Sequence, residues 1–165
     1  MSGILQDRDL RLRPVVLPDD VIVSLPWYRD PEVLYLSEGE GVLPYDEAMV
    51  SRMFDFLNER GELYIIEART IEEWFPIGDA ALLPDSLPIV IGNPWFRSRG
   101  FGGRVLRLLI ARAMALGWDS LRVKGVYTYN ERSLRLYEVA GFGRKEFHAD
   151  GDGPPAWSLE LILPQ

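Results

Sequence analysis

The sequence predicts an α/β or α+β domain built on a mixed sheet. Its 165 residues fit one compact domain, so we expect residues 1–165 to fold as a single unit. Seven short segments are typical of strands, and further segments repeat their apolar residues at helical spacing. The resulting order is βααβββαβαββ, and the alternation of strands and helices in the second half favours parallel neighbours there.

The first half begins with a strand and continues with helices. Residues 10–16 predict a strand because leucine and arginine alternate there before Pro18. Prolines at positions 26 and 31 divide residues 18–36 into one or two short helices. An amphipathic helix is expected at residues 45–60, because apolar side chains recur there at helical spacing before Gly61, namely Met49, Met53, Phe56 and Leu57.

The rest of the chain carries six of the seven expected strands. Three follow one another at residues 63–68, 76–83 and 87–92, and a Pro-Asp-Ser turn separates the last two. A helix at 103–116, a strand at 121–127 and a short helix at 130–139 come next, and glycines end both helices. Residues 142–147 and 156–163 complete the fold as a strand pair.

Composition excludes several classes of protein. The absence of cysteine rules out disulfides, thiolate catalysis and cysteine-type zinc sites, and a single histidine, His148, forms no metal cluster, so we expect no metal. The net charge of −7 disfavours a nucleic-acid partner. No apolar stretch is long enough to cross a bilayer and no signal peptide is visible, so we expect no membrane association and a cytoplasmic location.

Residues 89–104 carry the strongest functional signal. An apolar strand leads into a turn rich in glycine and arginine that opens a helix. Free N–H groups and the helix dipole at such a start favour a pyrophosphate, and Arg97, Arg99 and Arg104 could pair with its charge. A P-loop is excluded because Gly-Gly-Arg replaces Gly-Lys-Ser/Thr, and a dinucleotide fingerprint is excluded by Val105. A glycine-rich turn without a ligand stays the alternative.

Two motifs resemble the GNAT (Gcn5-related N-acetyltransferase) superfamily. The run Arg97-Ser98-Arg99-Gly100-Phe101-Gly102 matches that family's acetyl-CoA loop, Gln/Arg-x-x-Gly-x-Gly/Ala. Residues 130–142, Asn-Glu-Arg-Ser-Leu-Arg-Leu-Tyr-Glu-Val-Ala-Gly-Phe, are similar to its later helix, and the likeness is strongest over residues 77–147. Trp27, Asp30-Pro31 and Ile77-Gly78-Asp79 resemble the branch of ribosomal-protein and polyamine N-acetyltransferases.

The resemblance implies a fold and a cofactor. The fold is a mixed, mostly antiparallel seven-stranded sheet with flanking helices, in which two central parallel strands, residues 87–92 and 121–127, splay apart. Acetyl-CoA would be the co-substrate and would lie in that V, with its pantetheine amides against strand backbone and its pyrophosphate on the loop. Asn130 can also simply cap its helix. The implied cofactor-binding residues are Ile89, Val90, Ile91, Arg97, Ser98, Arg99, Gly100, Phe101, Gly102, Gly103, Arg104, Asn130 and Ser133.

The implied activity is transfer of an acetyl group to a primary amine, on a small molecule or a protein N-terminus, by direct attack. Tyr137 would be the catalytic residue that protonates the leaving thiolate, although it could also be a half-buried helix tyrosine without chemistry. The general base stays open, because the strand before the loop carries no acid. The candidates are Glu38, Glu40, Asp46, Glu47 and Asp79.

Acidic and aromatic residues are expected to wall the acceptor site. Trp27, Glu38 and Glu40 are its predicted substrate-binding residues, and their charge favours a cationic amine. The partners are therefore acetyl-CoA and an amine, while a homodimer stays open because the sequence does not reveal oligomeric state. The alternative function is a non-catalytic acyl-CoA-binding sensor module on the same fold.

Overall fold

The computed structural model describes residues 3–149, 151 and 153–165. Its elements follow in the order β1 (Leu5–Asp7), β2 (Leu10–Pro14), α1 (Asp19–Ser24), η1 (Trp27–Arg29), α2 (Pro31–Glu38), α3 (Glu47–Arg60), β3 (Glu62–Arg69), β4 (Trp74–Leu82), β5 (Ile89–Ile91), η2 (Pro94–Phe96), α4 (Phe101–Ala115), β6 (Ser120–Tyr127), α5 (Glu131–Val139), β7 (Gly143–His148) and β8 (Ala156–Ile162).

The strands form two sheets instead of the one that the sequence predicted. One has five strands in the order β1-β2-β3-β4-β5, and the other has three in the order β6-β8-β7. The antiparallel character and the flanking helices are confirmed, so the fold is α+β. The count of seven strands is wrong. Every pairing between described strands is antiparallel, so the expected parallel neighbours in the second half are absent there.

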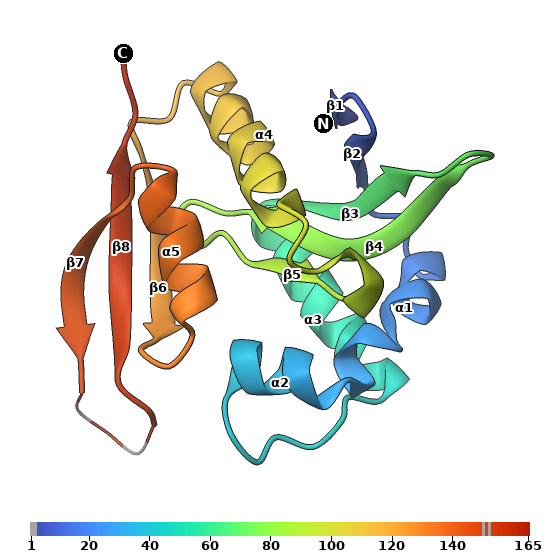
Figure 1. Cartoon of the computed structure of the whole chain (residues 1–165), viewed down its shortest axis with the longest axis horizontal. Helices are drawn as coiled ribbons and strands as arrows, with labels where there is room; N and C mark the ends of the chain where they lie inside the picture. The colour runs from blue at the N-terminus through green and yellow to red at the C-terminus, as the bar shows by residue number, and fades with distance from the viewer. Residues whose placement is uncertain (1–2, 150, 152) are drawn as a thin grey trace.

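The five-stranded sheet separates two hydrophobic cores. Side chains alternate along β3, so Leu63 and Ile65 face one core while Tyr64 and Ile66 face the other. Helices α1 and α3 cover the first face, and α4 crosses the second face between the two sheets (Figure 1). Helix α4 therefore packs on both the five-stranded sheet and α5, which fixes its N-terminal end beside β5.

The helices begin where local capping chemistry allows. Asp46 caps α3 by accepting from the Met49 N–H at 2.8 Å, and Asn130 caps α5 by accepting from the Ser133 N–H at 3.1 Å. Helix α4 begins at Phe101, two residues before the expected start. Gly100 makes this possible, because its φ of 81° lies in the left-handed region that glycine adopts without strain.

The two sheets part between β5 and β6. Strand β5 pairs only with β4, and β6 pairs only with β8, so no described ladder joins them. The register of β6 shifts between Val123 and Val126, around Gly125 with its φ of 69°. A bulge of this kind bends a strand and increases its twist. One edge of β5 consequently has no strand paired to it within the described ranges, and β5 ends the five-stranded sheet (Figure 1).

Candidate active site

A cavity of about 860 Å³ lies where the sheets part. Its wall includes β5, the loop into α4, β6, α5 and the inner side of α2. This volume is in the range of small-molecule sites. Of the residues that the sequence predicted to hold a cofactor, the structure brings eleven to this wall, namely Ile89, Val90, Ile91, Arg97, Ser98, Gly100, Phe101, Gly102, Gly103, Asn130 and Ser133.

The start of α4 forms an anion cradle at one end of the cavity. The first N–H groups of a helix have no acceptor in its own backbone, which here concerns those of Phe101, Gly102 and Gly103. The next one, of Arg104, already reaches the Gly100 carbonyl at 3.4 Å. Ser98 and Gly100 turn the chain before the helix, with φ of 59° and 81°. The cradle therefore offers donors and a partial positive charge to an anion.

The free edge of β5 leads away from this cradle. The Ala81 N–H donates to the Pro88 carbonyl at 3.0 Å. Because antiparallel pairing alternates, Val90 turns its backbone toward β4, whereas Ile89 and Ile91 turn theirs toward the cavity. The Leu87 carbonyl and the Ile91 carbonyl lie on this same edge and accept from Tyr137 and Arg97. Between them the backbone groups of Ile89 and the Ile91 N–H remain for a ligand.

Arg97 lies on the cavity wall but its guanidinium is already occupied. It donates to the Ile91 and Gly92 carbonyls at 2.9 and 3.0 Å, and it pairs with Asp30 at 3.0 Å and Glu32 at 2.8 Å. These bonds use four of its five N–H donors. Its predicted pairing with a cofactor phosphate therefore competes with these four bonds to the protein.

Two other predicted arginines lie outside the cavity wall. Arg104 points to the opposite side of α4, where it pairs with Asp7 at 3.2 Å and Asp9 at 2.6 Å. This contact lowers the pKa of Asp9, mainly through the hydrogen bond from the guanidinium. The guanidinium of Arg99 stacks at 5.8 Å over the exposed ring of Trp95. The structure thus separates these two side chains from the cradle.

Three arginines that sequence reasoning missed do line the cavity. They are Arg107 on α4 and Arg132 and Arg135 on α5. Among the described residues, none of the three has an ion-pair partner. For Arg132 and Arg135 the signal that could have found them is spacing, since residues three apart share a helix face. Arg107 follows the cradle on the same helix, but Arg104 shows that this position alone does not bring an arginine to the cavity.

Tyr137 lies at the far end of the β5 edge from the cradle. Its hydroxyl donates to the Leu87 carbonyl at 2.7 Å, and its ring packs edge-on against Phe142 at 5.5 Å. The residue is buried yet lines the cavity. Burial raises the pKa of Tyr137 above its ordinary range, so the phenol stays protonated as a proton donor must.

Asn130 has the structural role that the sequence left open. Its oxygen caps α5, while its amide nitrogen donates to the Leu36 carbonyl of α2 at 3.3 Å. Both Asn130 and Ser133 reach the cavity wall. Their placement allows capping and ligand contact together.

The predicted acceptor residues are only partly brought together. Trp27 is buried in the core under Gly92, where no side chain would fit, and it does not line the cavity. Glu38 is the last residue of α2, next to cavity-lining Ser37, and Glu40 lies two residues beyond it. Desolvation raises the pKa of Glu38, and a hydrogen bond with Tyr45 opposes that shift.

Asp79 is the one buried acid among the candidate bases. Its carboxylate accepts from the Tyr28 hydroxyl at 2.7 Å, and burial raises the pKa of Asp79 to about 7. It lies on the α3 side of the sheet and not on the cavity wall, although its cross-strand partner Val90 does line the cavity. Asp46 instead caps α3, and Glu47 is exposed in that helix.

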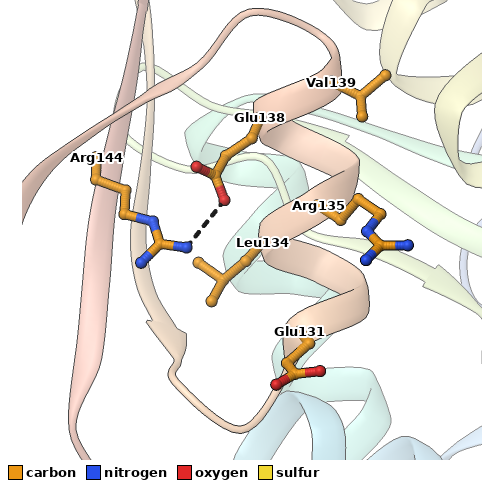
Figure 2. Close-up of a pocket in the computed structure, with 6 residues that line it drawn as sticks. All are labelled: Glu131, Leu134, Arg135, Glu138, Val139 and Arg144. Carbon is orange, nitrogen blue, oxygen red and sulfur yellow. Dashed lines mark hydrogen bonds and ion pairs between the residues drawn. The ribbon is translucent and has the colours of Figure 1, made fainter.

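A second hollow of about 610 Å³ lies on the outer side of α5 (Figure 2). Arg144 and Glu138 on its wall form an ion pair of 3.1 Å, while Arg135 points away from that pair. Opposite charges already meet there, and we place no function in it. Over the described ranges, no three His, Asp or Glu side chains converge as a metal site, and no helix is long and apolar enough to cross a membrane.

Comparisons with known proteins agree with this architecture. The family model described as acetyltransferase (GNAT) family matches residues 31–142. A search of curated proteins gives no match. A domain from Methanocaldococcus jannaschii has a TM-score of 0.78 at 17% identity and covers 93% of this chain and 98% of its own.

Two solved structures with bound coenzyme A are also similar. Aminoglycoside acetyltransferase AAC(6')-Ib with coenzyme A has a TM-score of 0.75 at 18% identity, covering 93% of this chain and 94% of its own. Spermidine N-acetyltransferase from Vibrio cholerae, in complex with CoA and spermine, has a TM-score of 0.72 at 15% identity, covering 94% and 96%. At these identities the likeness shows the fold alone.

Proposed function

The chain belongs to the GNAT acetyltransferase family, and we propose that it transfers an acetyl group from acetyl-CoA to a primary amine. The observation that carries this proposal is the order of features along one cavity. The anion cradle of α4, the free edge of β5 and the hydroxyl of Tyr137 follow one another. A pyrophosphate, a chain with amide groups and a thioester require that order.

Each part of the cofactor has matching residues. The N–H groups of Phe101, Gly102 and Gly103 would bind the pyrophosphate. The backbone of Ile89 and Ile91 would pair with the pantetheine amides as an added strand does. Asn130 and Ser133 lie across the cavity and would contact the same arm. Acetyl-CoA is therefore the proposed co-substrate, with Arg107, Arg132 and Arg135 in place of Arg99 and Arg104 as its cationic partners.

Tyr137 is the proposed catalytic acid. Attack of the amine on the thioester carbonyl forms a tetrahedral intermediate, which expels the thiolate of coenzyme A when the carbon–sulfur bond breaks. The phenol gives its proton to that sulfur and must leave the Leu87 carbonyl to do so. The attacking amine loses its proton to water, and the Tyr137 phenolate regains a proton from solvent after coenzyme A leaves. Asp79 takes no direct part in this step, because it is buried and does not line the cavity.

We propose a cationic amine as the acceptor, attracted by Glu38 at the end of α2 and by Glu40 just beyond it. Neighbours whose names include aminoglycoside and spermidine support this choice, as does the resemblance to the ribosomal-protein and polyamine branch. Single-domain organisation, a cytoplasmic location and a homodimer stay predictions.

The arginine assignment gives a first test. Replacing Arg107 by glutamine removes a cation that has no ion-pair partner among the residues that the structure describes, so CoA affinity should fall by about fivefold or more and depend less on salt. Calorimetric titration of CoA measures this. Arg52→Gln, an exposed arginine of α3 away from the cavity, is the matched control and should bind as wild type does. Equal affinity in both variants would remove Arg107 from the site.

The acceptor assignment gives a second test. In a screen of amines with acetyl-CoA, the best acceptor should be cationic at neutral pH. The double variant Glu38→Gln, Glu40→Gln should raise the KM for that acceptor by about tenfold, because two attracting charges are lost, and leave the KM for acetyl-CoA unchanged. An anionic best acceptor, or an unchanged acceptor KM in the double variant, contradicts the electrostatic assignment.

A further inference from the structure

Helix α2 is held at both ends by the two halves of the cavity. Its N-terminal end is tied to the chain that leaves β5, and its C-terminal end is tied to the chain that leaves β6. Three of its residues, Val33, Leu36 and Ser37, line the cavity between these attachments. An eight-residue helix has little stability of its own, so its position depends on such contacts.

Arg97 makes the N-terminal attachment. Its Nε and Nη2 groups hold the Ile91 and Gly92 carbonyls, which end the strand, while Nη2 and Nη1 reach Asp30 and Glu32 of α2. The two carboxylate oxygens of Asp30 have separate tasks. Oδ1 caps the helix by accepting from the Glu32 N–H at 2.9 Å, and Oδ2 accepts from Arg97 at 3.0 Å.

The end of β6 and the loop that leads to α5 make the C-terminal attachment. The last carbonyls of a helix have no N–H donor within the helix. Here side chains supply the missing donors. Tyr129 donates to the Tyr35 carbonyl at 2.7 Å, Asn130 to the Leu36 carbonyl and Tyr127 to the Glu38 carbonyl, both at 3.3 Å. The ring of Tyr129 also packs against Tyr35 at 4.5 Å.

We propose that Arg97 is a positioning residue and not a ligand of the cofactor phosphates. It positions the wall that α2 gives to the acceptor site, formed by Val33, Leu36 and Ser37. It sits in the loop that the sequence assigns to the cofactor, yet only 12% of its side chain is exposed and its bonds run to α2 and the end of β5. Because Asp30 caps α2, its bond to Arg97 fixes the position of that helix and of its cavity-lining residues Val33, Leu36 and Ser37. This inference rests on the proposed function, because it assigns Arg97 to the site of the amine acceptor and not to that of acetyl-CoA.

Two variants separate the roles. Arg97→Gln removes the guanidinium. Asp30→Asn keeps the helix cap, since asparagine caps as well as aspartate, but turns an amide toward Arg97. Arg104→Gln is the matched control, because it breaks a comparable pair of ion pairs from the same region outside the cavity wall. Each protein is examined with and without coenzyme A by calorimetry and by amide hydrogen exchange across residues 31–38.

Arg97→Gln and Asp30→Asn should each speed exchange in α2 by about tenfold or more, and both should bind CoA within about threefold of wild type. Both should also raise the KM for spermine by about tenfold, whereas Arg104→Gln should change neither the exchange rate of α2 nor the KM for spermine. Unchanged α2 exchange in both variants overturns the inference. So does a loss of CoA affinity in Arg97→Gln that Asp30→Asn does not share. Failure of the wild type to bind CoA would contradict the proposed function instead, and the α2 exchange rates would still decide the role of Arg97.

Discussion

Replacing Tyr137 by phenylalanine should lower kcat by about 10²-fold while the KM for acetyl-CoA stays near its wild-type value. The change deletes a hydroxyl and keeps the ring that packs against Phe142. A thiolate is a fairly good leaving group, so the loss should fall at the lower end of the range for a positioned acid. Steady-state thiol release with saturating amine measures the effect.

The stability of the Tyr137→Phe protein needs its own control. The Leu87 carbonyl loses the donor that the structure gives it, which should reduce the free energy of unfolding by about 1–3 kcal/mol. Tyr64→Phe is the matched variant, because Tyr64 is also buried and its hydroxyl bonds Glu62 at 2.8 Å away from the cavity wall. Both variants should lose stability, but only Tyr137→Phe should lose kcat. Wild-type kcat in Tyr137→Phe, with chemistry rate-limiting, would leave Tyr137 a packing residue.

The pH profile should carry the same signature. Burial raises the pKa of Tyr137, so the acid remains protonated to a higher pH than an exposed tyrosine would. The wild-type kcat should therefore show no alkaline fall from this group up to about pH 10, the ordinary tyrosine value. A tyrosine-dependent fall well below that pH would contradict the assignment.

Replacing Gly102 by valine should weaken CoA binding by about 30-fold, equivalent to about 2 kcal/mol, without unfolding the protein. A Cβ at this position would lie 3.5 and 3.7 Å from two Leu136 carbons, an ordinary contact, so the fold does not require glycine there. The larger side chain would instead occupy the cradle, where the pyrophosphate must approach the backbone closely. Calorimetric titration of CoA measures the loss.

Gly143→Val is the control for this change. Gly143 lies in β7, away from the cavity, and an added Cβ would meet no atom within 4 Å. The control should bind CoA as wild type does, while Gly102→Val should not. Unchanged affinity in a folded Gly102→Val protein would mean that the phosphates lie elsewhere.

Local sequence signals predicted the helices and the glycine turn well. Caps such as Asp46 and Asn130 accept from N–H groups only three residues ahead, and Gly100 adopts its positive φ without help from a distant residue, so these features require no distant partner. The division into two sheets depends on pairing between strands far apart in the chain, which periodicity does not encode. Strand β1 was missed because it is short and its neighbours are charged.

The site shows the same division between local and distant information. The cradle could be predicted, because its donors are backbone groups fixed by one turn. The fate of Arg97 could not, because Asp30 and Glu32 lie far away in the sequence and reach it only in the folded chain. Likewise Arg104 is drawn to Asp7 and Asp9 of an unexpected strand region, while Arg107, Arg132 and Arg135 come to the cavity from two helices.

The most direct test of the central claim is acetyl transfer itself. Purified protein is incubated with acetyl-CoA and a panel of amines that includes spermine and an aminoglycoside, and free thiol and acetylated amine are measured together. Thiol should be released in step with an acetylated product, only when an amine is present, and Tyr137→Phe should slow it by about 10²-fold. Tight acetyl-CoA binding with no acetylated amine from any member of the panel would contradict the proposed enzyme and favour a sensor of acyl-CoA.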